Sequence, residues 1–342
     1  MEKILYLAHT QSDGALPKAA LEALSAAIDV SQNLSESALS IGLVGGEIQT
    51  AADAVAGCGA SECLGVSGAE FAASRYSTDA AALTALAGAA GASLIVAPAT
   101  SRLSRVLPGV AHRLDGRIDT HVTGLQIEGD AVHIRRWYYR QRMAATLTRS
   151  QRPWVILIDA GVYDPWQGQA GSAALQAVSV DLPEIRTQVT GQEAALAGAQ
   201  TIRPDADLLF VAGAGWTKKQ ADGQAHAKDA EGLILGLLEK AQASLGSSKS
   251  LVDQSSEGQE VLSFMSHLNQ VGQTGSAPRH PKGLATCCHG EEPHAVGWRF
   301  ITERRAVNTD PNCGWAQGKA DVLYVADAFD VIAKVNELLG AG

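Results

Sequence analysis

Four short polar loops lie close together in the chain: Gly246-Ser247-Ser248-Lys249, Val271-Gly272-Gln273-Thr274-Gly275, Cys287-Cys288-His289-Gly290 and Val307-Asn308-Thr309-Asp310. Each of them follows, or lies beside, an apolar run that is typical of a strand. Tight loops at strand ends are where an open α/β sheet collects backbone N–H donors around a ligand. We therefore expect the stretch that ends at Asp321 to hold a polyanionic cofactor.

The apolar runs around these loops alternate between strand-like and helix-like patterns. We expect strands over 207–212, 250–252, 283–287, 305–307 and 321–325, and helices over 225–245 and 328–339. Strands that alternate with helices predict a parallel sheet covered by helices. The second half of the chain, 204–342, is therefore predicted to be a doubly wound domain.

The first half of the chain repeats the same rhythm. The predicted strands are 3–9, 38–44, 62–66, 93–97 and 155–159, and the predicted helices are 17–30, 50–56, 79–89 and 103–114. Alternating runs at 120–127 and 131–139, joined by Gly129-Asp130, predict an antiparallel hairpin. The expected fold class is α/β, with two doubly wound, mostly parallel sheet domains, the first carrying the hairpin. We place the first domain at 1–203, including a closing connection over 163–203.

Composition sets limits on the function. A chain of 342 residues exceeds the ~250–300 residues at which single cores usually stop growing, which favours two domains. A net charge of −9 argues against general binding to nucleic acid or to anionic membranes. No apolar run is long enough to span a bilayer, and the start of the chain has the pattern of a first strand. We therefore expect a cytoplasmic protein.

The five cysteines are an odd number in a chain with an ample core, so free thiols are expected. Cys287, Cys288 and His289 with His294 and Cys313 could be considered zinc ligands. Adjacent cysteines cannot easily point at one metal from an extended strand, however, and no C-x-x-C pair is present. We expect a buried cysteine and a polar loop here, and no metal.

Other motifs point to weaker hypotheses. Gly213-Ala214-Gly215 follows a predicted strand but lacks the third glycine of a dinucleotide loop, because Lys218 stands there. A tight strand-to-helix turn and a phosphate contact both remain open. The sequence contains no G-x-S-x-G, Walker lysine or H-E-x-x-H motif, so the usual signatures of hydrolysis and of nucleoside triphosphate turnover are absent from it.

A basic cluster follows the second arm of the predicted hairpin. Its members are Arg135, Arg136, Arg140, Arg142, Arg149 and Arg152, interleaved with Trp137, Tyr138 and Tyr139. Two interpretations are open: a solvated hairpin face with amphipathic arginine stems, or a docking surface for an acidic partner.

The order of these elements resembles the alpha subunit of the electron transfer flavoprotein family over nearly the whole chain. Ala97-Pro98-Ala99-Thr100 and Val106-Leu107-Pro108 are similar to stretches of the family's first domain. In the second domain, residues 271–275 reproduce the family's V-G-Q-T-G flavin loop. Asn308 lies in what resembles the family's A-I-N-x-D strand end.

The resemblance implies an electron carrier, not a stand-alone enzyme, that holds FAD between its C-terminal domain and a beta subunit. It implies a flavin dehydrogenase or demethylase as the electron donor. Thr274 would bond the ring N5, Lys249 would lie against the ring, and His294 would face the pyrimidine oxygen. The implied FAD-binding residues are Ser248, Lys249, Gly272, Gln273, Thr274, Gly275, Gly290, His294, Asn308 and Asp321. Of the two acidic positions that resemble the family's last strand, Asp321 and Asp327, the first would face the adenosine.

Departures from the family cluster on the cofactor. The G-G-R-G turn is Gly213-Ala214-Gly215-Trp216, and the ring arginine is Lys249. The S-G-A-I-Q-H loop has become 289–294, with Glu291 and Glu292 added, and the lysine after the flavin loop is Ser276. A less positive field should lower the potential of a flavin couple that gains negative charge. Two alternatives therefore stay open: a structural or interaction protein that kept the heterodimer and lost FAD, and an NAD(P)-dependent oxidoreductase.

Overall fold

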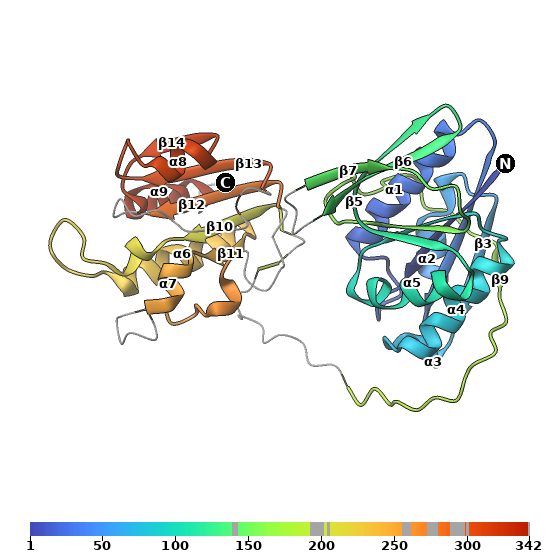
Figure 1. The fold of residues 1–342 in the computed structure, drawn as a ribbon. Helices are drawn as coiled ribbons and strands as arrows, with labels where there is room; N and C mark the ends of the chain where they lie inside the picture. Colours follow the sequence, from blue (N-terminus) through green and yellow to red (C-terminus); the bar gives the residue numbers. More distant parts are fainter. Residues whose placement is uncertain are drawn as a thin grey trace. The chain divides into compact units, whose positions relative to one another are not determined.

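The computed structural model describes residues 1–138, 143–191, 202–203, 206–254, 261–271, 280–287, 298 and 301–340. The chain divides into two compact units, Met1–Gln192 and Glu193–Gly342 (Figure 1). The predicted fold class is confirmed, because each unit is built on a mainly or wholly parallel sheet with helices on its faces. No helix within the described residues is long and apolar enough to cross a membrane.

The first unit contains a sheet with the strand order β7-β6-β5-β8-β4-β1-β2-β3-β9. Its strands are β1 (Glu2–His9), β2 (Ser37–Gly45), β3 (Glu62–Ser67), β4 (Leu94–Pro98), β5 (Arg117–Glu128), β6 (Ala131–Tyr138), β7 (Met143–Leu147), β8 (Trp154–Ile158) and β9 (Leu175–Ala177). All neighbours are parallel except β5–β6 and β6–β7. From β1 the sheet grows through β2 and β3 toward one edge, and from β4 it grows through β8 and β5 toward the other. The topological switch point therefore lies between β1 and β4.

Helices cover both faces of this sheet. One face carries α1 (Lys18–Asn33), α2 (Gln49–Ala54) and the 3-10 turn η1 (Ala56–Cys58), and the other carries α3 (Ala69–Ala72), α4 (Tyr76–Ala89) and α5 (Ser101–Arg113). β1 is buried on both faces: Ile4 and Tyr6 belong to the first core, and Leu5 and Leu7 to the second. Each such side chain stabilises the fold by roughly 1.5–3 kcal/mol. This explains why β1 reads as a continuous apolar run.

The antiparallel hairpin of β5 and β6 forms as predicted, and β7 extends it by a strand that the sequence pattern does not reveal. The chain after β8 then runs back across the first unit as a strap, residues 161–178. In this strap, Trp166 N–H donates a hydrogen bond to Leu21 O, and Gly171 N–H donates one to Asp53 O. β9 pairs with β3, which would otherwise be the edge of the sheet. The first part of the predicted connection is therefore an integral part of the first unit.

The second unit contains a five-stranded parallel sheet with the order β11-β10-β12-β13-β14. Its strands are β10 (Leu208–Ala212), β11 (Ser244–Ser247), β12 (Lys282–Cys287), β13 (Glu303–Asn308) and β14 (Val322–Val325). Its helices and 3-10 turns are η2 (Ala214–Thr217), α6 (Ala227–Ala241), α7 (Lys249–Asp253), η4 (His267–Asn269), α8 (Gly314–Lys319) and α9 (Ala328–Gly340). One core lies beneath α6 and α9, and the other beneath α8.

Two expectations for this unit are wrong. The helix predicted over 225–245 ends at Ala241, because Gln242 adopts a left-handed conformation with φ of 49° and the chain turns into β11. The strand predicted over 250–252 is instead part of helix α7. Ser248 accepts a hydrogen bond from Leu251 N–H and caps that helix, so the apolar pair Leu251 and Val252 packs from a helix, not from a strand.

Candidate functional site

The polar loops of the second unit begin at one edge of its sheet. Ala212, Ser247 and Thr286 lie side by side at the carboxyl ends of β10, β11 and β12. Asn308, the last residue of β13, pairs with Cys287. Doubly wound sheets bind ligands outside the carboxyl ends of their strands, so this edge is the candidate site.

Ser248 and Lys249 follow β11 directly and begin α7. Ser248 is fully buried, and its Oγ accepts from Leu251 N–H at 3.3 Å. The side chain of Lys249 is 65% exposed, and its Nζ lies 4.0 Å from Asp253 Oδ2. An exposed pair at that distance contributes little to stability. The ammonium group of Lys249 can therefore turn toward an anionic ligand at small cost.

The V-G-Q-T-G loop, residues 271–275, starts at the same edge. Val271 is fully buried, and its N–H donates to Ser247 O at 3.1 Å. Gly272, Gln273, Thr274 and Gly275, which come next, lie outside the described residues, as do Gly290 and His294. Val271 nevertheless fixes the starting point of the loop beside β11, next to Ser248.

Asn308 belongs to this edge by position and by contact. Its side chain is 1% exposed, and its Oδ1 accepts from Asp310 N–H at 2.8 Å. Asp310 Oδ1 in turn accepts from Asn312 N–H at 2.8 Å. The side chains of Asn308 and Asp310 thus fix the turn that leaves β13, which holds its backbone groups in place at the candidate site.

The structure does not bring Asp321 to this edge. Asp321 precedes β14 and therefore lies at the amino ends of the strands, where it accepts from Arg304 N–H at 2.7 Å and pairs with the Arg304 guanidinium at 2.7 Å. Those hydrogen bonds hold the pKa of Asp321 below its usual range. Asp327 follows β14 at the carboxyl end, and its Oδ1 accepts from Phe329 N–H. Of the two acidic positions, only Asp327 lies on the same edge as Asn308.

Ser247 lies in one of the four polar loops but is not among the FAD-binding residues that the resemblance implies. It is fully buried at the carboxyl end of β11, and its Oγ has no hydrogen-bond partner within the described part of the chain. An unsatisfied buried hydroxyl costs about 1–3 kcal/mol. A polar ligand at this edge would relieve that cost, so the residues present fit a polar cofactor.

The Gly213-Ala214-Gly215-Trp216 sequence forms the turn η2 at the end of β10. Trp216 is fully buried, its Nε1–H donates to Thr286 Oγ1 at 2.9 Å, and its ring lies 4.6 Å from that of Phe329. A Cβ on Gly213 would lie 2.9 Å from Thr286 O, which explains the glycine. Close packing thus accounts for this turn. Trp216 fills the core next to Gly215, the position where the resemblance to the family implies an arginine.

Three arginines of the basic cluster, Arg136, Arg149 and Arg152, pair with carboxylates inside the first unit. Asp119 is fully buried and accepts from Arg136 at 2.6 Å, from Arg149, and from Trp154 Nε1–H at 2.9 Å. Burial by itself raises the pKa of Asp119, but these hydrogen bonds hold it below its usual range. Arg152 pairs with Glu2 at 2.6 Å. Arg136, Arg149 and Arg152 therefore stabilise the fold, Arg135 is exposed, and Arg140 and Arg142 lie outside the described residues.

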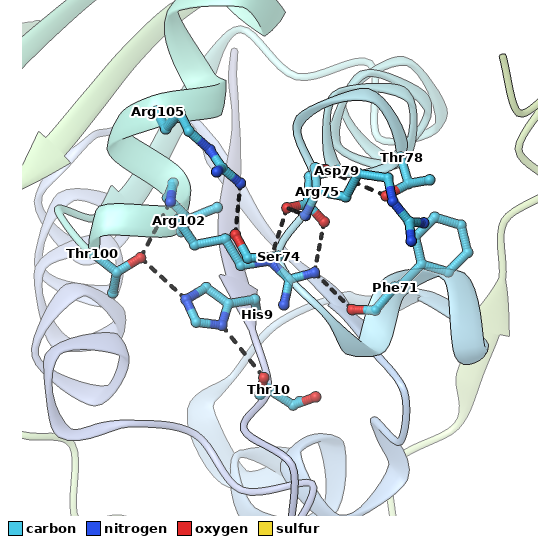
Figure 2. Close-up of polar contacts among 11 residues, drawn as sticks. His9, Thr10, Phe71, Ser74, Arg75, Thr78, Asp79, Thr100, Arg102 and Arg105 are labelled. Carbon is cyan, nitrogen blue, oxygen red and sulfur yellow. Dashed lines mark hydrogen bonds and ion pairs between the residues drawn. The ribbon is translucent and has the colours of Figure 1, made fainter. Parts of the chain in front are cut away.

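A second polar cluster lies at the switch point of the first unit (Figure 2). His9 ends β1 and its Nε2 lies 3.1 Å from Thr100 Oγ1, the cap of α5. Burial, with Arg102 nearby, lowers the pKa of His9, so the ring is neutral at pH 7. Arg102 is 8% exposed and donates to both oxygens of Asp79 and to Phe71 O. These contacts link β1, α3, α4 and α5 to one another.

Among the described residues no group of three histidine, cysteine or acidic side chains is placed to hold a metal ion. Cys58, Cys63, Cys287 and Cys313 are buried, and burial raises the pKa of Cys63 to about 11. Cys288, His289 and His294 of the zinc hypothesis lie outside the described residues.

The structure defines a two-unit α/β protein, and the candidate site lies at the carboxyl edge of the parallel sheet in the second unit. The model of the electron transfer flavoprotein domain matches residues 4–183, more than half of the chain. The chain belongs to the electron transfer flavoprotein family. Members of this family generally bind a flavin and typically form heterodimers. A search of curated proteins finds no match to the chain.

Proposed function

We propose that this chain is the alpha subunit of an electron transfer flavoprotein and that its second unit holds FAD. The observation that carries the proposal is the convergence of Ser248, Lys249, Asn308 and the start of the V-G-Q-T-G loop on one sheet edge. The family match supports it independently, because that match lies in the first unit and the site lies in the second.

The residues of the edge suit the parts of FAD differently. Lys249, exposed and weakly paired, supplies a cation toward the ring, and Ser247 supplies a buried hydroxyl. By the resemblance, Gln273 and Thr274 would supply an amide and a hydroxyl from the loop after Val271, and Gly290 and His294 would supply the remaining ring contacts. For the adenosine end we replace Asp321 by Asp327, because only the latter lies at the carboxyl edge. FAD, when bound, takes up and releases electrons one at a time.

We propose further that the chain does no substrate chemistry by itself. A flavin dehydrogenase or demethylase supplies the electrons, the beta-type partner completes the pocket, and a downstream acceptor receives the electrons. The buried Trp216, which stands beside the lost arginine position, favours one alternative, a heterodimer that no longer binds FAD.

The test is an absorption spectrum of the chain purified together with the beta-type chain of the same organism. A complex of the two chains that carries about one FAD supports the proposal. A stable complex that stays colourless after incubation with excess FAD would contradict the cofactor and leave the FAD-less alternative. Failure of the two chains to form a complex would contradict the subunit assignment.

A further inference from the structure

A positively charged surface lies on α5 and on the loop that leads into α4. We call it the α5 surface and define it by Arg75, Tyr76, Arg105 and Arg113. Arg105, Gly109 and Arg113 follow one another at intervals of four residues and so share one stripe of the helix. Arg105 Nη2 donates to Ser74 Oγ at 2.7 Å (Figure 2).

Tyr76 lies across this stripe between the two arginines. A Cβ on Gly109 would be 1.9 Å from Tyr76 Oη, so the ring rests directly on the glycine. The guanidinium carbon of Arg113 lies 5.8 Å from the ring centroid. Tyr76 is nevertheless 42% exposed, and Arg105 and Arg113 are exposed. The tyrosine is thus held in place while one part of it stays open to a partner.

The loop beneath this surface is fixed by a buried ion pair. Arg102 donates to Phe71 O at 2.6 Å and to Asp79 Oδ1 at 2.6 Å, and Asp79 Oδ2 accepts from Arg75 N–H at 3.2 Å (Figure 2). The segment 71–79, which runs from the end of α3 through the loop into the first turn of α4, is therefore anchored at both ends. Because Arg102 satisfies the carboxylate of Asp79, that carboxylate does not compensate the exposed arginines.

The α5 surface keeps its positive charge. Within the described ranges, no carboxylate lies in ion-pair distance of Arg105 or Arg113. Arg75 reaches a hollow of about 430 Å³ whose other charged side chains are Arg186 and Glu70. The whole chain has a net charge of −9, so this surface stands out against an acidic background.

We propose that the α5 surface docks an acidic protein partner, with Tyr76 as the central anchor and Arg105 and Arg113 pairing with the partner's carboxylates. Charge complementarity favours an acidic occupant. Tyrosine and arginine dominate the binding energy of protein interfaces, which favours a protein over a small ion. Arg136, Arg149 and Arg152 of the basic cluster do not compete for this role, because they are already paired within the unit.

A short polyglutamate peptide is the probe, titrated against the full chain in a calorimeter or by fluorescence. We expect Arg105→Gln and Arg113→Gln each to weaken binding about two- to fivefold, the range for an exposed ion pair. Arg105→Lys, which keeps the charge, should weaken it less. Tyr76→Ala should also weaken it, and binding should fall as salt shortens the Debye length. The matched control is Arg135→Gln, an exposed arginine on β6 that should leave the affinity unchanged.

Three outcomes would overturn the proposal. The first is the absence of any binding of polyglutamate at low salt. The second is an equal loss of affinity in Arg135→Gln, which would mean that the peptide senses general charge and not the α5 surface. The third is tighter binding of a single-stranded oligonucleotide of matched charge, which would assign the surface to nucleic acid. The peptide test involves no flavin, so its result is independent of the proposed cofactor site.

Discussion

Lys249 stands where the resemblance to the electron transfer flavoprotein family implies an arginine against the flavin ring. Lysine is a compact, strongly hydrated charge without the planar fork of arginine. If Lys249 lies against the ring of FAD, Lys249→Arg should stabilise the negative charge that reduction adds. The potential of the flavin should then rise, on a scale of about 30 mV per 1.4 kcal/mol for a two-electron couple. Spectroelectrochemistry of the FAD-loaded heterodimer measures this shift.

A matched control for this substitution is Lys334→Arg. Lys334 lies on α9, is exposed and pairs with Glu337, so the same chemical change there should leave the potential unaltered. If the flavin potential of Lys249→Arg equals that of the parent chain, Lys249 does not contact the ring, and the ring contact lies elsewhere on the carboxyl edge of the sheet.

Asp119 is the buried charge on which the hairpin depends. Asp119→Asn leaves Arg136 and Arg149 without their carboxylate, and breaking such a buried pair typically costs about 3–5 kcal/mol. The pKa of Asp119 is lower in the folded than in the unfolded chain. Its contribution to the free energy of unfolding is therefore present above the unfolded pKa of about 3.9 and is lost as the pH falls through the folded pKa. Urea unfolding at pH 7 and at low pH measures both effects.

In that experiment the variant should be much less stable at neutral pH, and the gap should narrow in acid. Asp181→Asn, at an exposed position of the connection, is the control and should change neither value. A gap of constant size across the pH range would mean that Asp119 acts through its shape and not through its charge.

At the scale of elements, the strap is the feature that sequence reasoning missed. A Cβ on Gly57 would lie 2.5 Å from Gln169 O, and Gly57 N–H donates to that same oxygen. Gly57→Ala should therefore push the strap off η1 and cost about 1–3 kcal/mol. Hydrogen exchange of the amides in β9 should become faster.

Gly88→Ala is the matched control for the strap. Gly88 lies inside α4, and a Cβ there meets no atom within 4 Å, so alanine should stabilise the helix by roughly 0.5–1 kcal/mol. If β9 exchanges at the same rate in Gly57→Ala as in the parent chain, the contact at Gln169 does not hold the strap.

The sequence predicts elements well where the apolar pattern is long and fails where a few contacts decide. The strands β1, β2 and β4 can be recognised in the sequence, because strands covered on both faces are nearly continuous apolar runs. The three-residue β9 has no pattern of its own, since only its pairing with β3 makes it a strand. At the site, Ser248, Lys249 and Asn308 could be located from their loops. Ser247 could not, because nothing in the sequence tells which of two adjacent serines is left without a hydrogen-bond partner among the described residues.

For the molecule as a whole, the connection between the units is shorter than its sequence suggests. The polar stretch 163–203 has the composition of a linker, yet its part up to Val178 is bonded to the first unit, where Val178 N–H donates to Gly65 O. Any movement of the cofactor unit against the first would therefore use residues after Val178. The same contacts imply that the strap belongs to the folding unit of the first domain.

Two shortened chains test this division. A chain that ends at Arg186 retains the strap, β9 and both cores of the first unit, so it should unfold cooperatively in urea. A chain that ends at Val162 loses Trp166 and Leu175 from the first core and exposes the edge of β3, and it should be less stable or aggregate. Equal stability of the two chains would show that the strap contributes nothing. A chain that ends at Arg186 and fails to fold would show that the first unit depends on the second, and the two units could then not move as separate bodies during electron transfer.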